Sequence, residues 1–244
     1  MALPKLEVPT YELELPISKK KIKYRPFLVK EQKNLLMAME SGDAASIQHN
    51  VREILDVCTL TTGIDVEELP ILDIEYYFIN LRAKSVGETI ESKYRCNNDV
   101  TDAEGTHKCG NLVPIEFNLL EVELPKMPKD NGKIMITDKL GIMMKYPTFE
   151  ILQKYQENDD AVILLNMIVS CIDYIFDEEQ IYYAKDTTEN ELTEFIEGLQ
   201  AADLQKIKEF LESMPKIKKD VQFKCGKCGY EENIELVGAQ SFFV

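Results

Sequence analysis

Hydrophobic and polar residues alternate in two short stretches near the start of the chain. Residues 11–15 and 22–24 both repeat with a period of two, which is typical of half-buried β-strands. Five residues, 16–20, connect the two stretches, and Pro26 follows the second. The pattern therefore predicts an antiparallel hairpin.

A helical period replaces the alternation after this hairpin. Apolar residues recur at spacings of three and four over residues 29–40 and again over 43–60, which predicts two amphipathic helices. Gly42 is placed to end the first helix and Asp43 to cap the second. The two helices are therefore expected to follow each other with almost no connection.

The middle of the chain mixes the two periods. Asp73 is the predicted N-cap of a third helix, which ends near Gly87. Residues 89–95 and 113–122 are then predicted to be extended. The change of period indicates that strands follow the first group of helices.

The remaining elements are predicted to be mostly helical. Residues 134–144 hold two short apolar stretches around a polar turn, which predicts a second hairpin, and residues 148–214 are predicted to be helical again. A helix over 160–172 is apolar nearly all round and is expected at the centre of the fold. Another begins with a capping box formed by Thr188 and Glu191. The sequence therefore predicts an α+β fold that is mainly helical, with short antiparallel hairpins.

Candidate chemistry is concentrated in the cysteines. Cys225 and Cys228 form a Cys-x-x-Cys-Gly knuckle, and two thiolates at this spacing can bind one tetrahedral metal ion. The glycine that follows permits the tight turn that such a knuckle needs. Because one knuckle supplies only two ligands, Cys96 and Cys109 are the candidates for the other two.

The surroundings of the two cysteine pairs match, so the chain carries one unit twice. Each unit has an aromatic residue two positions before its first cysteine, Lys-Cys-Gly at its second, and an apolar-Glu-apolar triplet six residues later. The matching segments are 94–96 with 223–225, 108–110 with 227–229, and 115–117 with 234–236. In the first unit twelve residues separate the cysteines, which predicts an enlarged surface loop.

Two such units facing each other predict a split zinc ribbon with the ligands Cys96, Cys109, Cys225 and Cys228. A Zn²⁺ ion held by four thiolates has no open position for water, so this ion, one per chain, would be structural. Iron in a similar geometry stays an alternative, as does a pair of knuckles that bind no metal. His107 could replace Cys109, but the repeat favours the cysteine.

The predicted elements divide the chain into four segments. Residues 1–87 hold the first hairpin and its helices, and 88–124 hold the first half of the ribbon. Residues 125–215 form an insert of a hairpin and helices, and 216–244 hold the second half of the ribbon and a C-terminal tail. The metal would therefore join the end of the chain to its middle.

The other cysteines and the histidines offer little further chemistry. Cys58 and Cys171 lie on apolar helical faces and are predicted to be buried structural thiols. His49 is predicted to lie on a helix surface. The chain lacks Gly-rich phosphate loops, nucleophile elbows and zinc-protease motifs. The sequence therefore predicts no catalytic residues and no enzyme.

Composition narrows the class of protein further. The 244 residues are 45% hydrophobic and 29% charged, which suits a folded core, and their formal net charge is −15. That charge opposes binding to nucleic-acid phosphates or to an anionic membrane surface. No signal-peptide pattern and no membrane-spanning stretch of ~20 apolar residues is found, so a cytosolic protein is expected.

Charge is distributed unevenly along the chain. Residues 1–30 contain seven Lys or Arg and three Glu, whereas 157–220 contain sixteen acidic and six basic residues. Both regions are interpreted either as solvated surfaces or as docking surfaces of opposite sign. The apolar tail, 238–244, folds onto the protein's own core or inserts into a neighbour, with Phe242 and Phe243 as candidate contacts.

Short segments in a fixed order cover nearly the whole chain: 9–15, 21–31, 35–40, 73–77, 171–176, 210–215 and the terminal Cys-x-x-Cys. In this order they resemble the baseplate hub proteins of T-even-like tailed bacteriophages. The individual segments are structural rather than catalytic, so the specificity of the resemblance comes from their number and order.

The resemblance implies a non-enzymatic protein of the phage tail baseplate that acts in assembly of the central hub. Its partners would be other hub and tail proteins, with no nucleic acid, membrane or small-molecule substrate. It would act in the host cytoplasm during assembly, and its presence in the finished virion is left open.

Two other classes of function are weighed against this one. The first is a zinc-ribbon adaptor that binds transcription machinery or nucleic acid, for which the basic residues near the second cysteine pair are candidates: Lys216, Lys218, Lys219, Lys224 and Lys227. The second is an enzyme with an unrecognised site. The net charge opposes the first, and the lack of catalytic motifs opposes the second.

Overall fold

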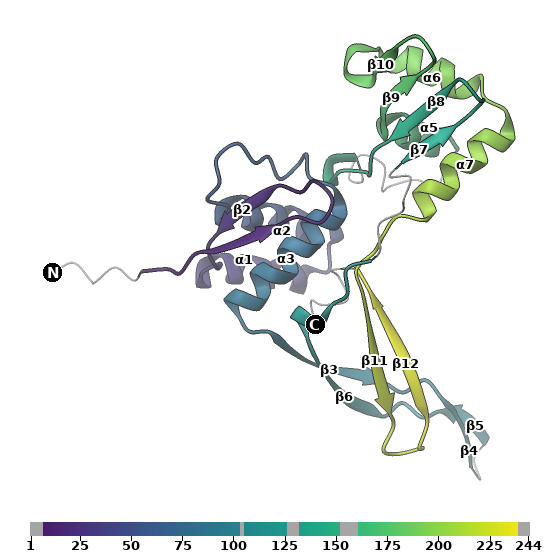
Figure 1. Ribbon diagram of the computed structural model, residues 1–244. Helices are drawn as coiled ribbons and strands as arrows, with labels where there is room; N and C mark the ends of the chain where they lie inside the picture. The colour runs from purple at the N-terminus through teal and green to yellow at the C-terminus, as the bar shows by residue number, and fades with distance from the viewer. Residues whose placement is uncertain (1–6, 103–104, 126–131, 152–160, 239–244) are drawn as a thin grey trace. The chain divides into compact units, whose positions relative to one another are not determined.

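The computed structural model describes residues 7–102, 105–125, 132–151 and 161–238. Over these ranges, strands β1 to β12 are interleaved with helices α1 to α3 and α5 to α7, as Figure 1 shows. The fold is a mixture of helices and antiparallel strands. The prediction that it is mainly helical is wrong, because strands occur in regions where only helices were expected.

The chain forms two compact units, each built from separate stretches of sequence. The first comprises residues 1–64, 75–125 and 216–244, and the second comprises 65–74 and 126–215. The finer division into four segments stays a prediction.

The first unit begins with the predicted hairpin, in which β1 (Tyr11–Glu14) pairs antiparallel with β2 (Lys21–Tyr24). The helices that follow are α1 (Val29–Ser41), α2 (Ala44–Cys58) and α3 (Ile71–Ser85), the last contributing residues 75–85 to this unit. The first two helices have nearly the predicted bounds.

The turn between α1 and α2 is confirmed. Gly42 ends α1 in the left-handed conformation, with φ of 68°, and its N–H donates to the Met39 carbonyl at 3.1 Å. The Asp43 carboxylate accepts the Ser46 N–H at 3.0 Å. Asp43 thereby satisfies one of the N–H groups that the first turn of α2 leaves free.

α3 begins earlier than predicted, so the assignment of Asp73 as its N-cap is wrong. The helix starts at Ile71, and the Ile74 N–H already donates to the Pro70 carbonyl at 3.1 Å. Asp73 lies in the first turn and is fully buried. An acidic residue is favourable both as a cap and within the first turn, which explains why residue type alone misplaced the boundary.

Tyr77 of α3 is the centre of the core in this part of the first unit. Its side chain is fully buried, and its ring meets the ring of Tyr24 edge-on, with 5.4 Å between centroids. The Tyr77 hydroxyl lies 3.0 Å from the Thr59 hydroxyl. This hydrogen bond offsets the cost of burying the phenol group away from water.

β-Hairpins make up the rest of the first unit. Two long ones are formed by β3 (Thr89–Arg95) with β6 (Leu112–Asn118), and by β11 (Lys218–Lys224) with β12 (Glu231–Val237). The twelve-residue segment predicted as a surface loop folds into a third hairpin, of β4 (Asp99–Asp102) and β5 (Gly105–Lys108). Figure 1 shows β4 and β5 beyond the ends of β3 and β6.

The chain leaves the first unit after residue 125 and returns at 216, and these two points are held together. Glu123 forms a β-bridge with Lys218, and the Lys219 ammonium lies 3.1 Å from a Glu121 carboxylate oxygen. The first unit can therefore accommodate the long intervening segment without separating its own strands.

A four-stranded antiparallel sheet forms one layer of the second unit, in the order β10-β9-β8-β7. Its strands are β7 (Lys133–Met135), β8 (Gly141–Met144), β9 (Ile172–Phe176) and β10 (Ile181–Tyr183). The pairing of β7 with β8 confirms the second predicted hairpin. The prediction that residues 148–214 are all helical is wrong, because β9 and β10 interrupt the helices.

Helices cover one face of this sheet and form the core with it. They are α5 (Ala161–Ser170), α6 (Glu189–Glu197) and α7 (Ala201–Glu212). Ile142 and Ile175 of the sheet belong to one buried cluster with Ile168, Ile196 and Ile207 of the helices. Such a continuous apolar cluster is the main stabilising feature of a small unit.

The starts of these helices were predicted with mixed success. α6 has the predicted capping box, in which Thr188 accepts the Glu191 N–H at 3.3 Å and Glu191 accepts the Thr188 N–H at 2.9 Å. α5 occupies most of the predicted apolar helix. The helix expected to start at Thr148 falls largely on residues outside the described ranges. None of the described helices is long and apolar enough to cross a membrane.

Candidate metal centre

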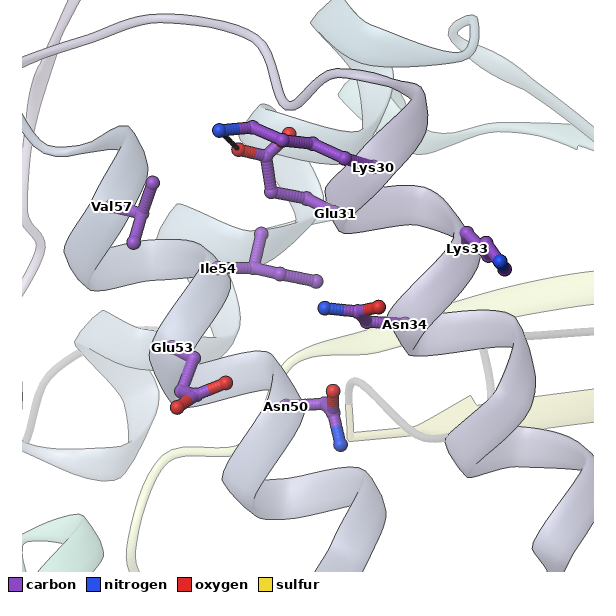
Figure 2. A pocket seen from close by; sticks show the side chains of 8 residues that line it. All are labelled: Lys30, Glu31, Lys33, Asn34, Asn50, Glu53, Ile54 and Val57. Carbon is purple, nitrogen blue, oxygen red and sulfur yellow. Dashed lines mark ion pairs between the residues drawn. The ribbon is translucent and has the colours of Figure 1, made fainter.

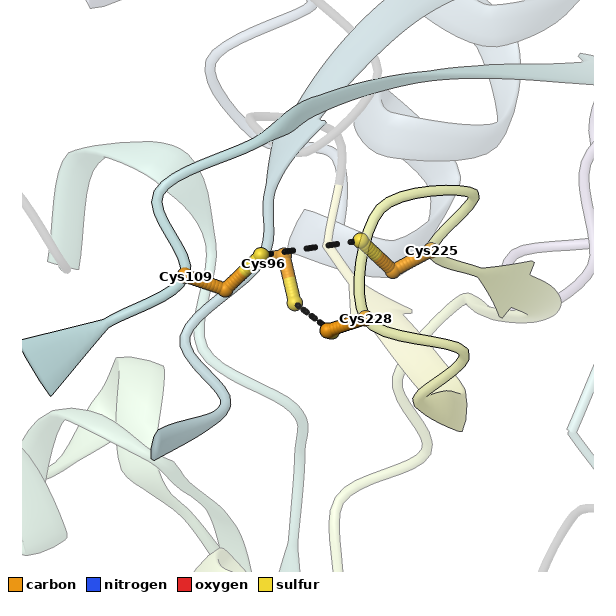
Figure 3. A group of neighbouring side chains, drawn as sticks. All are labelled: Cys96, Cys109, Cys225 and Cys228. Carbon is orange, nitrogen blue, oxygen red and sulfur yellow. Dashed lines mark hydrogen bonds between the residues drawn. The ribbon is translucent and has the colours of Figure 1, made fainter. Parts of the chain in front are cut away.

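The four cysteines of the repeated unit meet at the ends of the two long hairpins. Cys96 and Cys109 lie between β3 and β6, and Cys225 and Cys228 lie in the turn between β11 and β12. Figure 3 shows the four side chains turned toward one another, and their sulfur atoms all lie within 4.8 Å of each other. Three of the cysteines are buried and Cys228 is partly exposed.

The distances between these sulfurs fit a tetrahedral metal site. The Sγ atoms of Cys96 and Cys228 are 3.7 Å apart, and those of Cys109 and Cys225 are 3.8 Å apart. Metal–sulfur bonds of about 2.3 Å in a tetrahedron place the sulfurs about 3.8 Å from each other. A disulfide would need about 2.05 Å. The donor set is therefore suited to a thiolate-bound metal and not to a disulfide.

The backbone confirms that the two knuckles are equivalent. The Gly110 N–H donates to the Cys96 carbonyl at 3.0 Å, and the Gly229 N–H donates to the Cys225 carbonyl at 2.9 Å. Both glycines are left-handed, with φ of 64° and 74°. A side chain is strained in this conformation, so the glycine after the second cysteine is required by the turn.

Equivalent aromatic residues also pack against each other. Tyr94 and Phe223 each precede the first cysteine of a pair by two positions, and their rings meet edge-on at 5.2 Å. This contact lies between β3 and β11, one strand from each hairpin. The two long hairpins thus share a ring contact beside the cysteine cluster.

Backbone N–H groups point at the sulfur of Cys225. Those of Cys228 and Lys227 donate to it and, with the side chain of Asn111, lower the pKa of the Cys225 thiol to about 6. Burial raises the pKa of Cys96 in the same cluster. N–H groups that solvate a thiolate favour the deprotonated form that binds metals.

Two asparagines complete the site, and sequence reasoning missed both. Asn111 donates its side-chain amide to Cys225 Sγ at 3.5 Å, and Asn98 donates to Cys228 Sγ at 3.8 Å. Each asparagine follows a cysteine of the first pair by two residues and bonds to a cysteine of the second pair. That shared spacing is a weak signal in the sequence, and only the folded arrangement shows that the two amides point at sulfur.

The remaining candidate residues lie elsewhere. His107, the alternative ligand, is half exposed on β5, with its ring 3.7 Å from the Asp102 carboxylate. Cys58 and Cys171 are fully buried, as predicted, and burial raises their thiol pKa values to about 11 and about 12. His49 lies on the surface of α2, as predicted. Phe242 and Phe243 lie outside the described residues.

The lysines near the second knuckle are largely neutralised. Lys218 pairs with Glu235, Lys219 with Glu121, and Lys224 with Glu231. These ion pairs occupy the charges that a nucleic-acid phosphate would need.

A surface groove of about 430 Å³ lies between α1 and α2 in the first unit. Figure 2 shows Ile54 and Val57 on the α2 side of the groove and the ion pair of Lys30 with Glu31 on the α1 side. The Lys30 ammonium lies 3.4 Å from a Glu31 carboxylate oxygen. Neither cysteine nor histidine lines the groove. Its polar and ionic rim is unrelated to the metal centre.

Comparison with known proteins agrees with the resemblance in the sequence. Residues 8–244 match the family model described as T4 bacteriophage base plate protein. The chain is 26% identical over 234 residues to the baseplate hub assembly protein gp26 of Enterobacteria phage T4, covering 96% of this chain and 97% of that protein. No solved structure matches. The matched residues include all four clustered cysteines. Because the family model covers nearly the whole chain, the chain belongs to the T4 bacteriophage base plate protein family.

Proposed function

We propose that the chain is a non-enzymatic assembly protein of the central hub of a phage tail baseplate, folded around one structural Zn²⁺ ion. The observation that carries the metal assignment is the cluster of four cysteine sulfurs within 4.8 Å of one another. Membership of the base plate family and similarity to a hub assembly protein support the biological role.

Cys96, Cys109, Cys225 and Cys228 would hold the ion. The all-thiolate donor set suits Zn²⁺, and it leaves no position for a reacting water. Four thiolates in the same geometry can also bind an iron ion. Elemental analysis of purified protein would therefore identify the metal. Because the ligands come from positions more than a hundred residues apart, the ion would join two hairpins that share no chain continuity.

The protein would act through contacts with other hub and tail proteins during assembly in the host cytoplasm. It would need no small-molecule substrate, nucleic acid or membrane for this role. Whether it stays in the finished virion is decided by looking for the chain in purified phage particles. Its presence there at a fixed copy number identifies a structural part, and its absence identifies a transient assembly factor.

The test of this function is complementation of a phage that lacks the gene. The wild-type chain is expected to restore complete tails and infectivity, and the Cys225→Ser variant is expected to fail. Lys227→Ala is the matched control, because Lys227 is exposed in the same turn and alanine keeps its backbone N–H. Infectious, complete tails without the chain would contradict the assembly role.

A further inference from the structure

The four-stranded sheet of the second unit has one covered face and one open face. The covered face holds Ile142 and Ile175, which belong to the buried cluster formed with the helices. The open face consists of two rows of residues that lie opposite one another across the strands, and such residues share a face of the sheet. The first row is Lys133, Met143, Tyr174 and Tyr183. The second row is Met135, Gly141, Phe176 and Ile181.

Apolar and aromatic side chains make up nearly all of the open face. Met135, Ile181 and Tyr183 are 39%, 50% and 44% exposed, and neither row contains an acidic residue. Antiparallel sheets usually present a polar face to water. The neighbouring sequence is acidic, so an apolar face without carboxylates is a local exception. An exposed apolar surface of this kind is typical of a protein-binding site.

The aromatic rings of the open face already pack against each other. The Tyr174 ring meets the Phe176 ring at 6.1 Å and the Tyr183 ring at 5.7 Å between centroids. The Phe176 ring lies against Gly141, where an added Cβ atom would come within 2.3 Å of it. The missing side chain of Gly141 therefore lets this ring cover β8. A partner would find these rings in place and would have little side-chain entropy to remove.

Lysines lie at both edges of the open face. The Lys133 ammonium on β7 is 5.1 Å from the centre of the Phe176 ring, and the Lys185 ammonium after β10 is 5.4 Å from the centre of the Tyr183 ring. Both lysines are exposed, so water solvates their charges. A partner that covers the rings would remove part of this water, and a desolvated ammonium needs a carboxylate. The edges of the face therefore favour a partner with acidic residues.

The width of the sheet indicates which element fits between these lysines. Four strands at a spacing of ~4.8 Å measure about 14 Å across. An α-helix with its side chains has a diameter of about 10–12 Å. One helix that lies along the strands therefore fits between Lys133 and Lys185. Helices cover the other face of this sheet, so a helix here would complete a common three-layer arrangement.

We propose that the open face binds one amphipathic helix of a partner protein, with an apolar stripe against the rings and acidic residues on both flanks. Carboxylates on one flank pair with Lys133, and those on the other flank pair with Lys185. The contact is small, and interfaces at the low end of the size range are typical of transient complexes. The proposal rests on the proposed hub role only in describing one of its partners, and it is independent of the metal centre.

Peptide binding to the purified, metal-loaded full chain tests the proposal without any other phage protein, so it can fail without contradicting the hub role. The probes are two fluorescent synthetic helices of about 18 residues with the same leucine stripe and with either glutamate or lysine on both flanks. Fluorescence anisotropy in about 0.15 M salt is expected to give a dissociation constant of about 10–100 μM for the glutamate peptide. The lysine peptide is expected to bind at least tenfold more weakly.

This order of affinities is informative because the formal net charge of −15 would by itself favour the lysine peptide. Equal binding of the two peptides would overturn the proposal. A preference for the lysine peptide, or no binding of the glutamate peptide at about 1 mM, would overturn it as well.

A charge swap tests the two lysines. The double variant Lys133→Glu with Lys185→Glu is expected to reverse the preference, so that the lysine peptide binds at least tenfold more tightly than the glutamate peptide. Lys33→Glu with Lys208→Glu is the matched control, because it makes the same change of charge on α1 and α7. An equal shift in both double variants would reflect net charge alone and would contradict the proposal.

Shortening apolar side chains tests the open face itself. Met135→Ser with Ile181→Ser is expected to weaken binding of the glutamate peptide at least tenfold. Val29→Ser with Leu36→Ser removes exposed apolar side chains from α1 and is the control that should leave binding unchanged. Unchanged binding by the Met135→Ser, Ile181→Ser variant would place the peptide elsewhere and would overturn the proposal.

The same Met135→Ser, Ile181→Ser variant identifies other occupants of the open face. A dimer of the chain in sedimentation equilibrium that this variant abolishes would assign the face to a second copy. Binding of an oligouridylate that this variant abolishes would assign the face to single-stranded nucleic acid, whose bases stack on aromatic side chains. Either result would overturn the assignment to a partner helix.

Discussion

Asn98 and Asn111 bring two side chains that are not candidate ligands into contact with the cysteine sulfurs. Each donates an amide to a sulfur of the opposite knuckle, at 3.8 Å and 3.5 Å. Asparagine is common in turns for backbone reasons, so its presence after a cysteine carries little information by itself. The cysteines could be identified from spacing, whereas the asparagines required the folded arrangement.

Replacing Asn111 should weaken metal binding without unfolding the ribbon. Asn111→Ala removes the amide that stabilises the Cys225 thiolate but keeps the backbone groups at that position, and a loss of about tenfold in metal affinity is expected. Competition with a chromogenic chelator measures this affinity. Asn97→Ala, at an exposed neighbouring position, is the control. Equal metal affinities for the two variants would show that the Asn111 amide does not contribute to metal binding.

Glu31 gives the first unit a stability that depends on pH. Burial alone would raise the pKa of this carboxyl, but hydrogen bonds from Arg25 at 3.0 Å and from the Leu28 N–H at 2.8 Å outweigh it and hold the pKa below its ordinary value of 4.5. A carboxyl whose pKa is lower in the folded state stabilises the fold above its unfolded pKa. That stability is lost as the pH falls through the folded value.

Glu31→Gln should therefore destabilise the first unit by about 1–2 kcal/mol at neutral pH. The difference from the wild type should shrink as the pH falls from 4.5 through the lower folded pKa, because Glu31 becomes protonated over this range and is then uncharged like glutamine. Urea unfolding at several pH values measures this difference. Glu40→Gln, at an exposed position on the same helix, is the control. A difference that does not vary with pH would contradict the ionic role of Glu31.

At the level of elements, the hairpin of β4 and β5 is larger than the metal centre requires. The second knuckle closes with two residues between its cysteines, whereas the first uses twelve. All four residues of β5 are exposed. An isolated two-stranded hairpin is only marginally stable, so β4 and β5 depend on the ribbon that carries them.

Shortening this hairpin should leave the metal centre intact. Replacing residues 97–108 by Gly-Lys, the pair between Cys225 and Cys228, removes Asn98 together with the hairpin and is expected to keep one metal per chain at a lower affinity. The two-residue turn supplies its own N–H groups to sulfur, as it does in the second knuckle. Loss of the metal in this variant would show that the hairpin is part of the site.

β9 and β10 were missed for a physical reason. Their segment follows an apolar helix, and a short apolar run has no periodicity that separates a strand from a helix. The turn contained the signal for a strand, because the Asp177 carboxylate accepts the N–H groups of Glu179 and Gln180 at 2.8 Å. The sequence Asp-Glu-Glu is equally typical of the start of a helix. The strand conformation of β9 therefore depends on its pairing with β8.

For the whole molecule, the internal repeat made a contact between segments far apart in the sequence predictable. Cys96 and Cys225 could be placed together because their surroundings match, and symmetry-related units tend to face each other. The first hairpin, the Gly42–Asp43 turn and the capping box were predictable because they depend on local groups. The sheet of the second unit was not, because its order is set by packing between segments distant in the sequence.

Metal analysis of the purified full-length chain tests the metal-centred fold most directly. Elemental analysis should find one Zn²⁺ per chain, and removing it should expose four reactive thiols and unfold the ribbon, since binding and folding are coupled. Cys225→Ser should lose the metal, whereas Lys227→Ala should retain it. A chain that stays folded with the same melting temperature in excess chelator, and that contains no metal, would contradict the structural zinc site.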